Sequence, residues 1–367
     1  MLKAILIDCI PPGIKPQEAE YRLNEAENLI KTYGGVVLVK KIQKKLTPNY
    51  KTYLGQGKID EIIEENQELE ANIIIVNNEL KPRQTYNLSE LVRPSKLQVW
   101  DRIDLILKIF QKHASTKEAK LEIELASIRH MGPRIFGMGI ELSRQAGGIG
   151  TRGRGETNIE FMRRHLKKME GAIRKDLEKC KKVRKLHRKG RKRKNLKTVG
   201  IIGYTNAGKT SLLNALTRKG AEAADKLFAT LDTRVGKIYY ENTGEEILVS
   251  DTIGFIQDLP TPLIKSFQST LEETIEADLL LHVIDVNDPK MRDKMKVVNV
   301  ILAQIDALHK PTAYVFNKTD TSPKKSFSKL AQEFKAHSPC FVSAVTGEGI
   351  NKLKGVIQEK ITPTSAK

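Results

Sequence analysis

The sequence predicts an α/β protein in which a domain with a mostly parallel sheet is preceded by an α/β subdomain and an antiparallel helical hairpin. Three observations support this fold class. Short β-branched apolar runs, typical of buried strands, alternate with helical segments in the N-terminal and C-terminal parts of the chain. Two long apolar stripes with helical spacing occupy the part between them. A glycine-containing loop at residues 203–210 follows one predicted strand and precedes a helix.

The first hundred residues are expected to form the small α/β subdomain. Residues 1–8 are too few and too polar for a signal peptide and predict a first strand. A helix is predicted over residues 17–31, with further strands at residues 36–39 and 73–76. Residues 55–58, Gly-Gln-Gly-Lys, are too short for a phosphate loop, so we interpret them as a tight turn into a helix.

The sequence pattern in the middle of the chain predicts two helical arms. A helix over residues 101–113 is followed by a capping box at residues 115–118, which starts another helix. A second capping box at residues 157–160 opens a helix of about 30 residues, roughly 45 Å long. Apolar side chains in both arms recur at steps of three and four, so we expect the arms to pack as an antiparallel hairpin.

The connection predicted between Met131 and Glu156 is long and positively charged. Its residues 147–155 contain five glycines together with Arg152 and Arg154. Loops of this length are usually functional or disordered. A basic glycine-rich loop orders on RNA when its guanidinium groups stack on bases or pair with phosphates. The alternative is a disordered connector.

The chain as a whole is strongly basic. Its 63 Lys and Arg residues exceed its 44 Asp and Glu residues, and the formal net charge is +19. Residues 181–197 carry eleven of the cations and no carboxylate. A solvated linker is one interpretation, but we favour contact with the phosphate backbone of a nucleic acid. The run lacks the apolar face that membrane-surface helices need.

Composition argues against several other classes. No apolar run reaches 18 residues, so we expect no membrane span. The three cysteines, Cys9, Cys180 and Cys340, are far apart and show neither metal nor disulfide spacing, which indicates a reducing cytoplasm. We expect a cytoplasmic monomer.

The loop at residues 203–210, Gly-Tyr-Thr-Asn-Ala-Gly-Lys-Thr, fits the phosphate-binding pattern G-x-x-x-x-G-K-[ST]. Its glycines let several backbone N–H groups point at phosphates, and the following helix start adds a partial positive charge. We expect Lys209 to reach the β- and γ-phosphates and Thr210 to hold Mg²⁺. The residues expected to bind nucleotide here are Gly203, Asn206, Ala207, Gly208, Lys209, Thr210 and Ser211.

A second motif predicts which base is bound. Asn317-Lys318-Thr319-Asp320 follows a predicted buried strand at residues 312–316. A carboxylate only accepts hydrogen bonds, so Asp320 favours guanine, whose N1–H and 2-amino groups donate, over adenine. Asn317 and Lys318 would hold the base and its loops, and the backbone of Ser343 and Ala344 would contact the guanine oxygen. Away from a phosphate loop these residues would be an ordinary polar turn; after one they predict GTP or GDP as ligand.

Asp251-Thr252-Ile253-Gly254 ends a further apolar strand. Asp251 would hold Mg²⁺ through water, and Gly254 would bring its N–H close to the γ-phosphate. With these motifs in order, residues 198–361 resemble translational and Ras-like GTPases.

The resemblance has one departure that concerns catalysis. Ras-like proteins place a Gln after the switch glycine to orient the attacking water, and here that position is Phe255. We therefore expect slow intrinsic GTP hydrolysis, with the water positioned by a partner, by backbone or by an ordered ion. Asn206 resembles the asparagine of potassium-activated GTPases, so K⁺ is a candidate ion; the alternative is a surface-facing polar loop residue.

The hydroxyl that closes on Mg²⁺ is expected between residues 227 and 233. Thr230 and Thr233 both fit, and Thr230 is preferred because Phe228-Ala229-Thr230-Leu231-Asp232 resembles the same segment of the Obg–HflX class. The alternative is a polar loop whose hydroxyls bond their own backbone. The expected catalytic residues are Lys209, Thr230 and Gly254, and the expected metal ligands are Thr210, Thr230 and Asp251.

Taken together the chain resembles the HflX family of GTPases over nearly its whole length. Besides the motifs above, the resemblance is carried by L-G-Q-G-K at residue 54, W-D-R-I-D-L-I-L-K-I-F at residue 100, G-I-G-T-R-G-R-G-E-T at residue 148 and L-L-L-H-V-I-D at residue 279. The resemblance implies binding to the large ribosomal subunit and its rRNA, with splitting or rescue of stalled ribosomes as a possible role.

Two functions are carried forward: a GTPase that associates with the large ribosomal subunit, and a GTP-dependent signalling switch that binds a protein partner through its hairpin. An RNA-modifying enzyme is less favoured because no metal cluster or methyl-donor motif is seen. The expected domains are an α/β subdomain at 1–100, a helical hairpin at 101–187, a basic linker at 188–195, a GTPase domain at 196–362 and a tail at 363–367.

Overall fold

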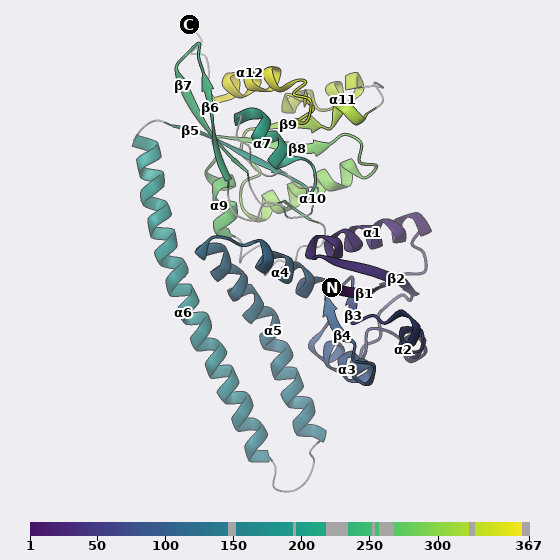
Figure 1. Cartoon of the computed structure of the whole chain (residues 1–367). Coiled ribbons are helices and arrows are strands. Elements are labelled where there is room, and N and C mark those ends of the chain that lie inside the picture. Colours follow the sequence, from purple (N-terminus) through teal and green to yellow (C-terminus); the bar gives the residue numbers. More distant parts are fainter. Residues whose placement is uncertain are drawn as a thin grey trace. The chain divides into compact units, whose positions relative to one another are not determined.

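The computed structural model describes residues 1–145, 152–193, 196–217, 234–251, 254–256, 268–322 and 327–361 (Figure 1). The chain divides into two compact units, each with its own sheet. The first unit comprises Met1–Lys112 and Lys120–Leu177, and the second comprises His113–Ala119 and Glu178–Lys367. The domain boundaries expected from the sequence remain predictions.

The sheet of the first unit is entirely parallel, with strand order β2-β1-β3-β4. Its strands are β1 (Leu2–Ile10), β2 (Gly35–Lys44), β3 (Ile73–Val76) and β4 (Gln98–Asp101). All four residues of β3 are buried, as expected for a β-branched run in a sheet covered by helices. The strands predicted at residues 1–8 and 36–39 lie within β1 and β2 except for Met1, and the one predicted at residues 73–76 coincides with β3, so all three are confirmed.

Helices connect these strands and follow the last of them. They are α1 (Pro16–Tyr33), α2 (Gln56–Leu69), α3 (Pro82–Val92) with the short η1 (Arg93–Ser95), and α4 (Arg102–His113). Gly55 is the N-cap of α2, so the predicted tight turn into a helix is confirmed. One apolar core between α2, α3 and the sheet includes Leu54, Ile59 and Leu88.

Two long helices follow, α5 (Lys117–Gln145) and α6 (Arg152–Arg193). The Thr116 hydroxyl accepts the Ala119 N–H at 3.2 Å and caps α5. Figure 1 shows α5 and α6 as antiparallel arms, and an ion pair of 3.1 Å joins Arg129 of α5 to Glu170 of α6. The predicted hairpin is therefore confirmed within the described residues.

The predicted loop between Met131 and Glu156 is wrong in extent, because α5 continues to Gln145 and α6 begins at Arg152. Pro133 lies inside α5. The turn around it is held by Arg134, which pairs with Asp101 and with Asp104, the latter at 2.7 Å. These tertiary ion pairs offset the helix-breaking tendency of Pro133.

The second arm also differs from its prediction. It starts five residues before the capping box expected at Thr157. At its other end α6 runs through most of the basic run, so residues 181–193 are helical. In the described part of this run the side chains of Lys181, Lys182, Lys185, Lys189 and Arg193 are exposed.

The sheet of the second unit has strand order β10-β9-β8-β5-β7-β6 and is parallel except for the edge strand β6. The strands are β5 (Lys197–Gly203), β6 (Arg234–Tyr240), β7 (Glu245–Asp251), β8 (Leu279–Asp285), β9 (Thr312–Asn317) and β10 (Cys340–Phe341). The expected mostly parallel sheet is confirmed.

The helices of the second unit are α7 (Lys209–Thr217), α9 (Gln268–Glu276), α10 (Met291–Gln304), α11 (Phe327–Glu333) and α12 (Ile350–Ile361), with short η2 (Thr319–Thr321) and η3 (Lys335–His337). The main core packs α7 and α12 against the sheet through Leu212, Leu353 and Ile357. None of the described helices is both long and apolar enough to cross a bilayer.

Candidate nucleotide-binding site

The predicted phosphate loop joins the carboxyl end of β5 to the start of α7. Asn206 and Gly208 have positive φ values of 62° and 90°, which turn the backbone sharply before the helix. A Cβ atom at Gly208 would lie 2.2 Å from Nδ2 of Asn317. This close approach explains why glycine stands there, and it brings the phosphate loop against residues 317–320, the predicted base-reading motif.

Lys209 is the first residue of α7 and is buried. Its Nζ donates to the Tyr204 carbonyl at 2.8 Å. Burial lowers the pKa of Lys209 to about 8, although the nearby Asp251 carboxylate favours the charged form. The ammonium therefore lies inside the loop and is poorly solvated.

Thr210, in the first turn of α7, lies next to Asp251, the last residue of β7. β5 and β7 pair in parallel with Ile201 opposite Asp251, and the Thr210 hydroxyl donates to Oδ2 of Asp251 at 2.7 Å. A hydroxyl and a carboxylate oxygen at this spacing fit the oxygen ligands that Mg²⁺ prefers in phosphate-transfer sites. Thr230, the third expected ligand, and Thr233 lie outside the described residues.

The segment after Asp251 pairs with the phosphate loop through its backbone. Phe255 N–H donates to the Gly203 carbonyl at 3.1 Å, and Thr205 N–H donates to the Phe255 carbonyl at 2.7 Å. The Phe255 side chain is fully buried. The residue that replaces the expected Gln therefore serves packing, and its ring is not available to contact a water molecule.

Gly254 lies against the phosphate loop. A Cβ atom there would be 2.8 Å from Cγ2 of Thr205 and 2.9 Å from Nζ of Lys209. The Gly254 backbone therefore lies next to the Nζ of Lys209, which is expected to hold the terminal phosphates. Its placement fits the predicted approach of the Gly254 N–H to a γ-phosphate.

The base-reading residues come together on two adjacent loops. Asn317 Nδ2 donates to the Ala207 carbonyl at 3.0 Å, and its Oδ1 accepts the Ala344 N–H at 3.1 Å. One buried amide thus links the phosphate loop to the loop after β10, as the sequence predicted for Asn317. Ser343 is fully buried and Asp320 is exposed.

Lys318 is held in a left-handed conformation with φ of 66°. Its Nζ pairs with Asp285 at the end of β8 at 2.8 Å, and its carbonyl accepts from Asn287 Nδ2 at 2.9 Å. These two contacts tie the base-reading loop to the end of the neighbouring strand.

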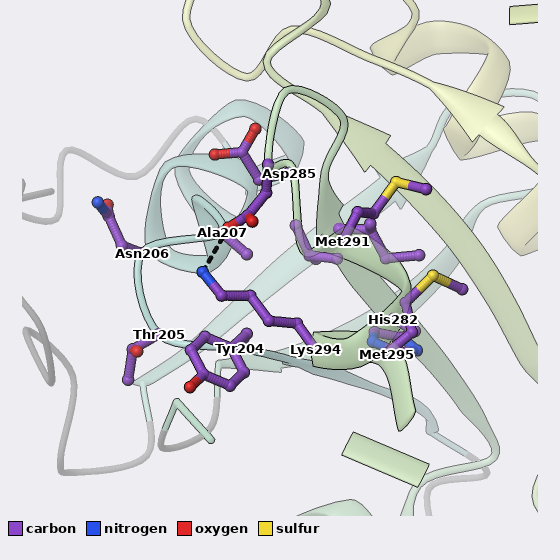
Figure 2. A pocket seen from close by; sticks show the side chains of 12 residues that line it. Tyr204, Thr205, Asn206, Ala207, His282, Asp285, Met291, Lys294 and Met295 are labelled. Carbon is purple, nitrogen blue, oxygen red and sulfur yellow. Dashed lines mark hydrogen bonds and ion pairs between the residues drawn. The ribbon is translucent and has the colours of Figure 1, made fainter. Parts of the chain in front are cut away.

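A small cavity of about 70 Å³ beside the phosphate loop was not predicted from the sequence (Figure 2). Tyr204 to Ala207 form one wall, and the end of β8 with the start of α10 forms the other. Lys294 crosses it, pairs with Asp288 and places its Nζ 4.6 Å from the centre of the Tyr204 ring. His282 lies at its base, where burial lowers its pKa to about 3 and keeps it neutral. For the wall formed by β8, the L-L-L-H-V-I-D segment was the only signal noted in the sequence.

Comparisons with known proteins agree with the geometry. Three family models match: "GTP-binding GTPase N-terminal" at residues 20–111, "GTP-binding GTPase Middle Region" at 113–191 and "50S ribosome-binding GTPase" at 198–318. A GTPase HflX of Caldanaerobacter subterraneus is 46% identical over 84% of this chain and 71% of its own length. A GTPase HflX of Escherichia coli is 39% identical over 93% of this chain and 79% of its own length.

Solved structures are similar over the full chain. A complex of SsGBP with GDP has a TM-score of 0.56 at 27% identity and covers 100% of both chains. A GTP-binding protein of Sulfolobus solfataricus in complex with GDP has a TM-score of 0.53 at 25% identity and covers 99% of both. The similarity therefore includes the phosphate loop, the base-reading loop and the N-terminal unit.

Proposed function

The chain belongs to the HflX family of GTPases, which bind and hydrolyse GTP, and we propose that its nucleotide cycle controls association with the large ribosomal subunit and its rRNA. The observation that carries the proposal is the long cationic helix α6, which joins the first unit to the GTPase sheet within one chain. The description of the matching GTPase model as ribosome-binding points to the same partner.

The geometry supports a role for each predicted phosphate-loop residue. Backbone N–H groups from Gly203 to Ser211 would surround the phosphates, and Lys209 would move from the Tyr204 carbonyl to the β- and γ-phosphate oxygens. Thr210 and Asp251 would hold Mg²⁺, the latter through water, with Thr230 as the expected third ligand. Bound Mg²⁺ would neutralise charge that develops on the phosphate oxygens.

The base site would select guanine. Asp320 is exposed and therefore open to a ligand, and the loop beneath it is fixed by Asn317 and Lys318. Its carboxylate would accept from guanine N1–H and the 2-amino group. The Ser343–Ala344 backbone lies next to Asn317 through the Ala344 N–H and would face the guanine oxygen.

Hydrolysis would be slow in the isolated protein, because the buried ring of Phe255 offers no hydrogen bond to the attacking water. Positioning of that water would then come from the bound subunit or from a K⁺ ion near Asn206, whose exposed side chain stands at the outer turn of the loop. In this scheme subunit binding and hydrolysis are coupled, since the subunit completes the catalytic site.

The RNA contact would lie on α6. In the first unit Arg163, Arg164, Lys167 and Lys168 are exposed on this helix, and in the second unit Lys181, Lys182, Lys185, Lys189 and Arg193 are exposed. A row of cations along one helix gives sequence-independent, salt-sensitive affinity for a phosphate backbone. Arg152 and Arg154 lie at the start of α6 and are proposed to extend this contact.

Cosedimentation with purified large subunits tests this function. The wild type loaded with a nonhydrolysable GTP analogue should pellet with the subunits, and the fraction bound should fall steeply with salt. Arg152→Ala combined with Arg154→Ala should weaken subunit binding while guanine-nucleotide affinity is retained. If this variant binds subunits with the same affinity as the wild type, the two arginines are not part of the interface. A shallow salt dependence would favour the protein-partner switch instead.

A further inference from the structure

An exposed tyrosine in the first unit is flanked by two cations. Tyr50 lies in the connection between β2 and α2 and is 65% exposed. The Lys81 Nζ lies 5.9 Å from the centre of its ring and the Arg83 Cζ lies 5.4 Å from it. By contrast Tyr53, three residues later, is 2% exposed. Core packing accounts for Tyr53 but gives no reason for an aromatic ring at position 50.

The loop that carries Tyr50 has a defined conformation. Asn49 and Tyr53 exchange two backbone hydrogen bonds, each of 2.9 Å. The Asn49 side-chain oxygen also accepts the N–H groups of Lys51 at 2.8 Å and Thr52 at 3.3 Å. Residues 49–53 therefore form a closed turn that presents the tyrosine outward.

The same turn is attached to the helix that supplies the cations. Gln84 Nε2 donates to the Asn49 carbonyl at 2.7 Å, and Asn87 Nδ2 donates to the Lys51 carbonyl at 2.9 Å. Both amides belong to α3, which begins directly after Lys81 and contains Arg83. The backbone on each side of Tyr50 is thus fixed to α3, which places the turn that carries the ring next to the helix that carries Arg83.

The surroundings are positively charged. Residues 40–55 contain five lysines and no carboxylate. Lys40 and Lys41 are paired with glutamates of α1 and α2, whereas Lys44, Lys45 and Lys51 are exposed. The Tyr50 surface is defined here as Tyr50, Lys81, Arg83, Lys44, Lys45 and Lys51. It combines one aromatic face with several cations.

We propose that the Tyr50 surface binds single-stranded RNA, with a nucleobase stacked on the Tyr50 ring and the adjacent phosphates contacted by the lysines and Arg83. Aromatic rings stack on any base, and cations beside the ring contact the backbone on either side. Duplex RNA does not fit, because its bases are already stacked and only unpaired bases reach an aromatic side chain. Preorganisation by Gln84 and Asn87 lowers the entropy that stacking costs.

The inference goes beyond the proposed ribosome-binding function, because it adds a contact separate from the cations of α6 and does not rest on that function. A protein partner is less favoured, because Leu46 is the only other large apolar side chain exposed in the described loop at residues 45–55. Protein interfaces usually centre on several buried apolar anchors.

The test is fluorescence anisotropy of the full-length protein with labelled oligouridylate of about 12 nucleotides, a length within the range that single-strand-binding folds cover. Tyr50→Ala should weaken binding about tenfold or more, because stacking contributes on the order of 1–3 kcal/mol per base. Tyr50→Phe should bind within about twofold of the wild type, since it keeps the ring. Tyr239→Ala is the matched control: Tyr239 is 60% exposed on β6 in the second unit and should have no effect.

Salt dependence separates stacking from charge. The weaker binding of Tyr50→Ala should persist at high salt. Lys81→Met with Arg83→Met should instead lower the slope of log affinity against log salt by about 0.7 for each phosphate that these cations neutralise in the wild type. Tyr50→Ala with wild-type affinity at every salt concentration would overturn the proposal. So would an equal reduction of affinity for duplex and single strand, or an affinity for Tyr50→Phe as low as that of Tyr50→Ala.

These outcomes are distinguishable from failure of the proposed function. If the wild type pellets with large subunits while Tyr50→Ala binds oligouridylate normally, the ribosome proposal stands and the Tyr50 surface does not bind RNA. If Tyr50→Ala no longer binds oligouridylate while the wild type ignores subunits, the opposite holds. A thermal melt that coincides with that of the wild type shows that Tyr50→Ala is folded.

Discussion

The Thr205 N–H donates to the carbonyl of Phe255 at 2.7 Å, so the phosphate loop and the segment that follows Asp251 are joined as one backbone unit. A buried phenyl side chain anchors that unit in the core. This arrangement differs from one in which the residue after the switch glycine turns toward the water. Phe255 therefore has a packing role, and we expect other groups to position the attacking water.

Gly254→Ala should strongly reduce GTP hydrolysis. The added methyl group would lie 2.8 Å from Cγ2 of Thr205 and 2.9 Å from Nζ of Lys209, closer than nonbonded atoms approach. We expect a reduction of at least about tenfold in the single-turnover rate, comparable with the removal of one transition-state donor. Gly355→Ala in α12, where a Cβ would meet no atom within 4 Å, should be neutral. Equal rates for the two variants would contradict the proposed close approach.

Nucleotide binding should take up a proton at alkaline pH. The pKa of Lys209 is lowered to about 8 by burial, and phosphates would raise it again by stabilising the ammonium. Proton uptake on GDP binding should therefore be small at about pH 7 and approach about one proton at about pH 9, and affinity should fall as the pH rises through 8. Calorimetry in buffers of different ionisation enthalpy measures this uptake. A constant value across the range would rule out Lys209 as the titrating group.

Arg184 of α6 pairs with Glu118 at the start of α5 and with Glu272 of α9, each at 2.8 Å, and all three side chains are mostly buried. Since α9 is the first described helix after Asp251, we expect Arg184→Met to reduce stimulation of hydrolysis by large subunits severalfold while the intrinsic rate is unchanged. The exposed Arg174, which pairs with Glu170 within α6, provides a control, because exposed pairs contribute only about 0–1 kcal/mol. Equal stimulation of Arg184→Met and Arg174→Met would show that the pairs with Glu118 and Glu272 are purely structural.

The first unit should lose stability at alkaline pH. Burial disfavours the charged form of His130, but its contacts with Asp101 and Asp104 outweigh this effect and raise its pKa to about 9. A raised folded-state pKa contributes stability that is fully present below about pH 6.5 and lost as the pH rises through 9. We expect a contribution on the order of 1–3 kcal/mol.

Thermal unfolding of the wild type and of His130→Gln between about pH 6 and pH 10 measures this contribution. The difference in stability between the two proteins should shrink as the pH rises. A difference that does not change with pH would assign His130 a packing role only. Lys209, whose pKa shifts in the opposite direction, is present in both proteins and cancels.

The nucleotide site was predictable because its signals are local. Glycines, a lysine and a carboxylate at fixed spacing specify a loop whose backbone does most of the binding, and the structure brings Gly208, Lys209, Asp251 and Asn317 together as expected. The roles of these residues with nucleotide remain predictions, as does that of Thr230.

What the sequence did not reveal depends on contacts between distant residues. The segment after Met131 was expected to be a loop, but it continues α5, and Arg134 within it pairs with Asp101 and Asp104. Tyr50 resembles any loop tyrosine, because the cations beside it come from residues 81 and 83. Arg184 is one of many cations in its run, and it is distinguished by its two partners, Glu118 and Glu272, the latter 88 residues away. Spacing along the chain carries no information about such pairs.

The most direct test of the central claim is steady-state GTP hydrolysis with and without purified large ribosomal subunits, measured in K⁺ and in Na⁺. The account predicts a slow basal rate that subunits increase strongly. The bound subunit would position the attacking water, which Phe255 cannot do in place of a glutamine. A further increase in K⁺ alone, abolished in Asn206→Ala, would assign the ion to that residue. An unchanged rate together with no cosedimentation would contradict ribosome-coupled hydrolysis and favour a switch that binds a protein partner.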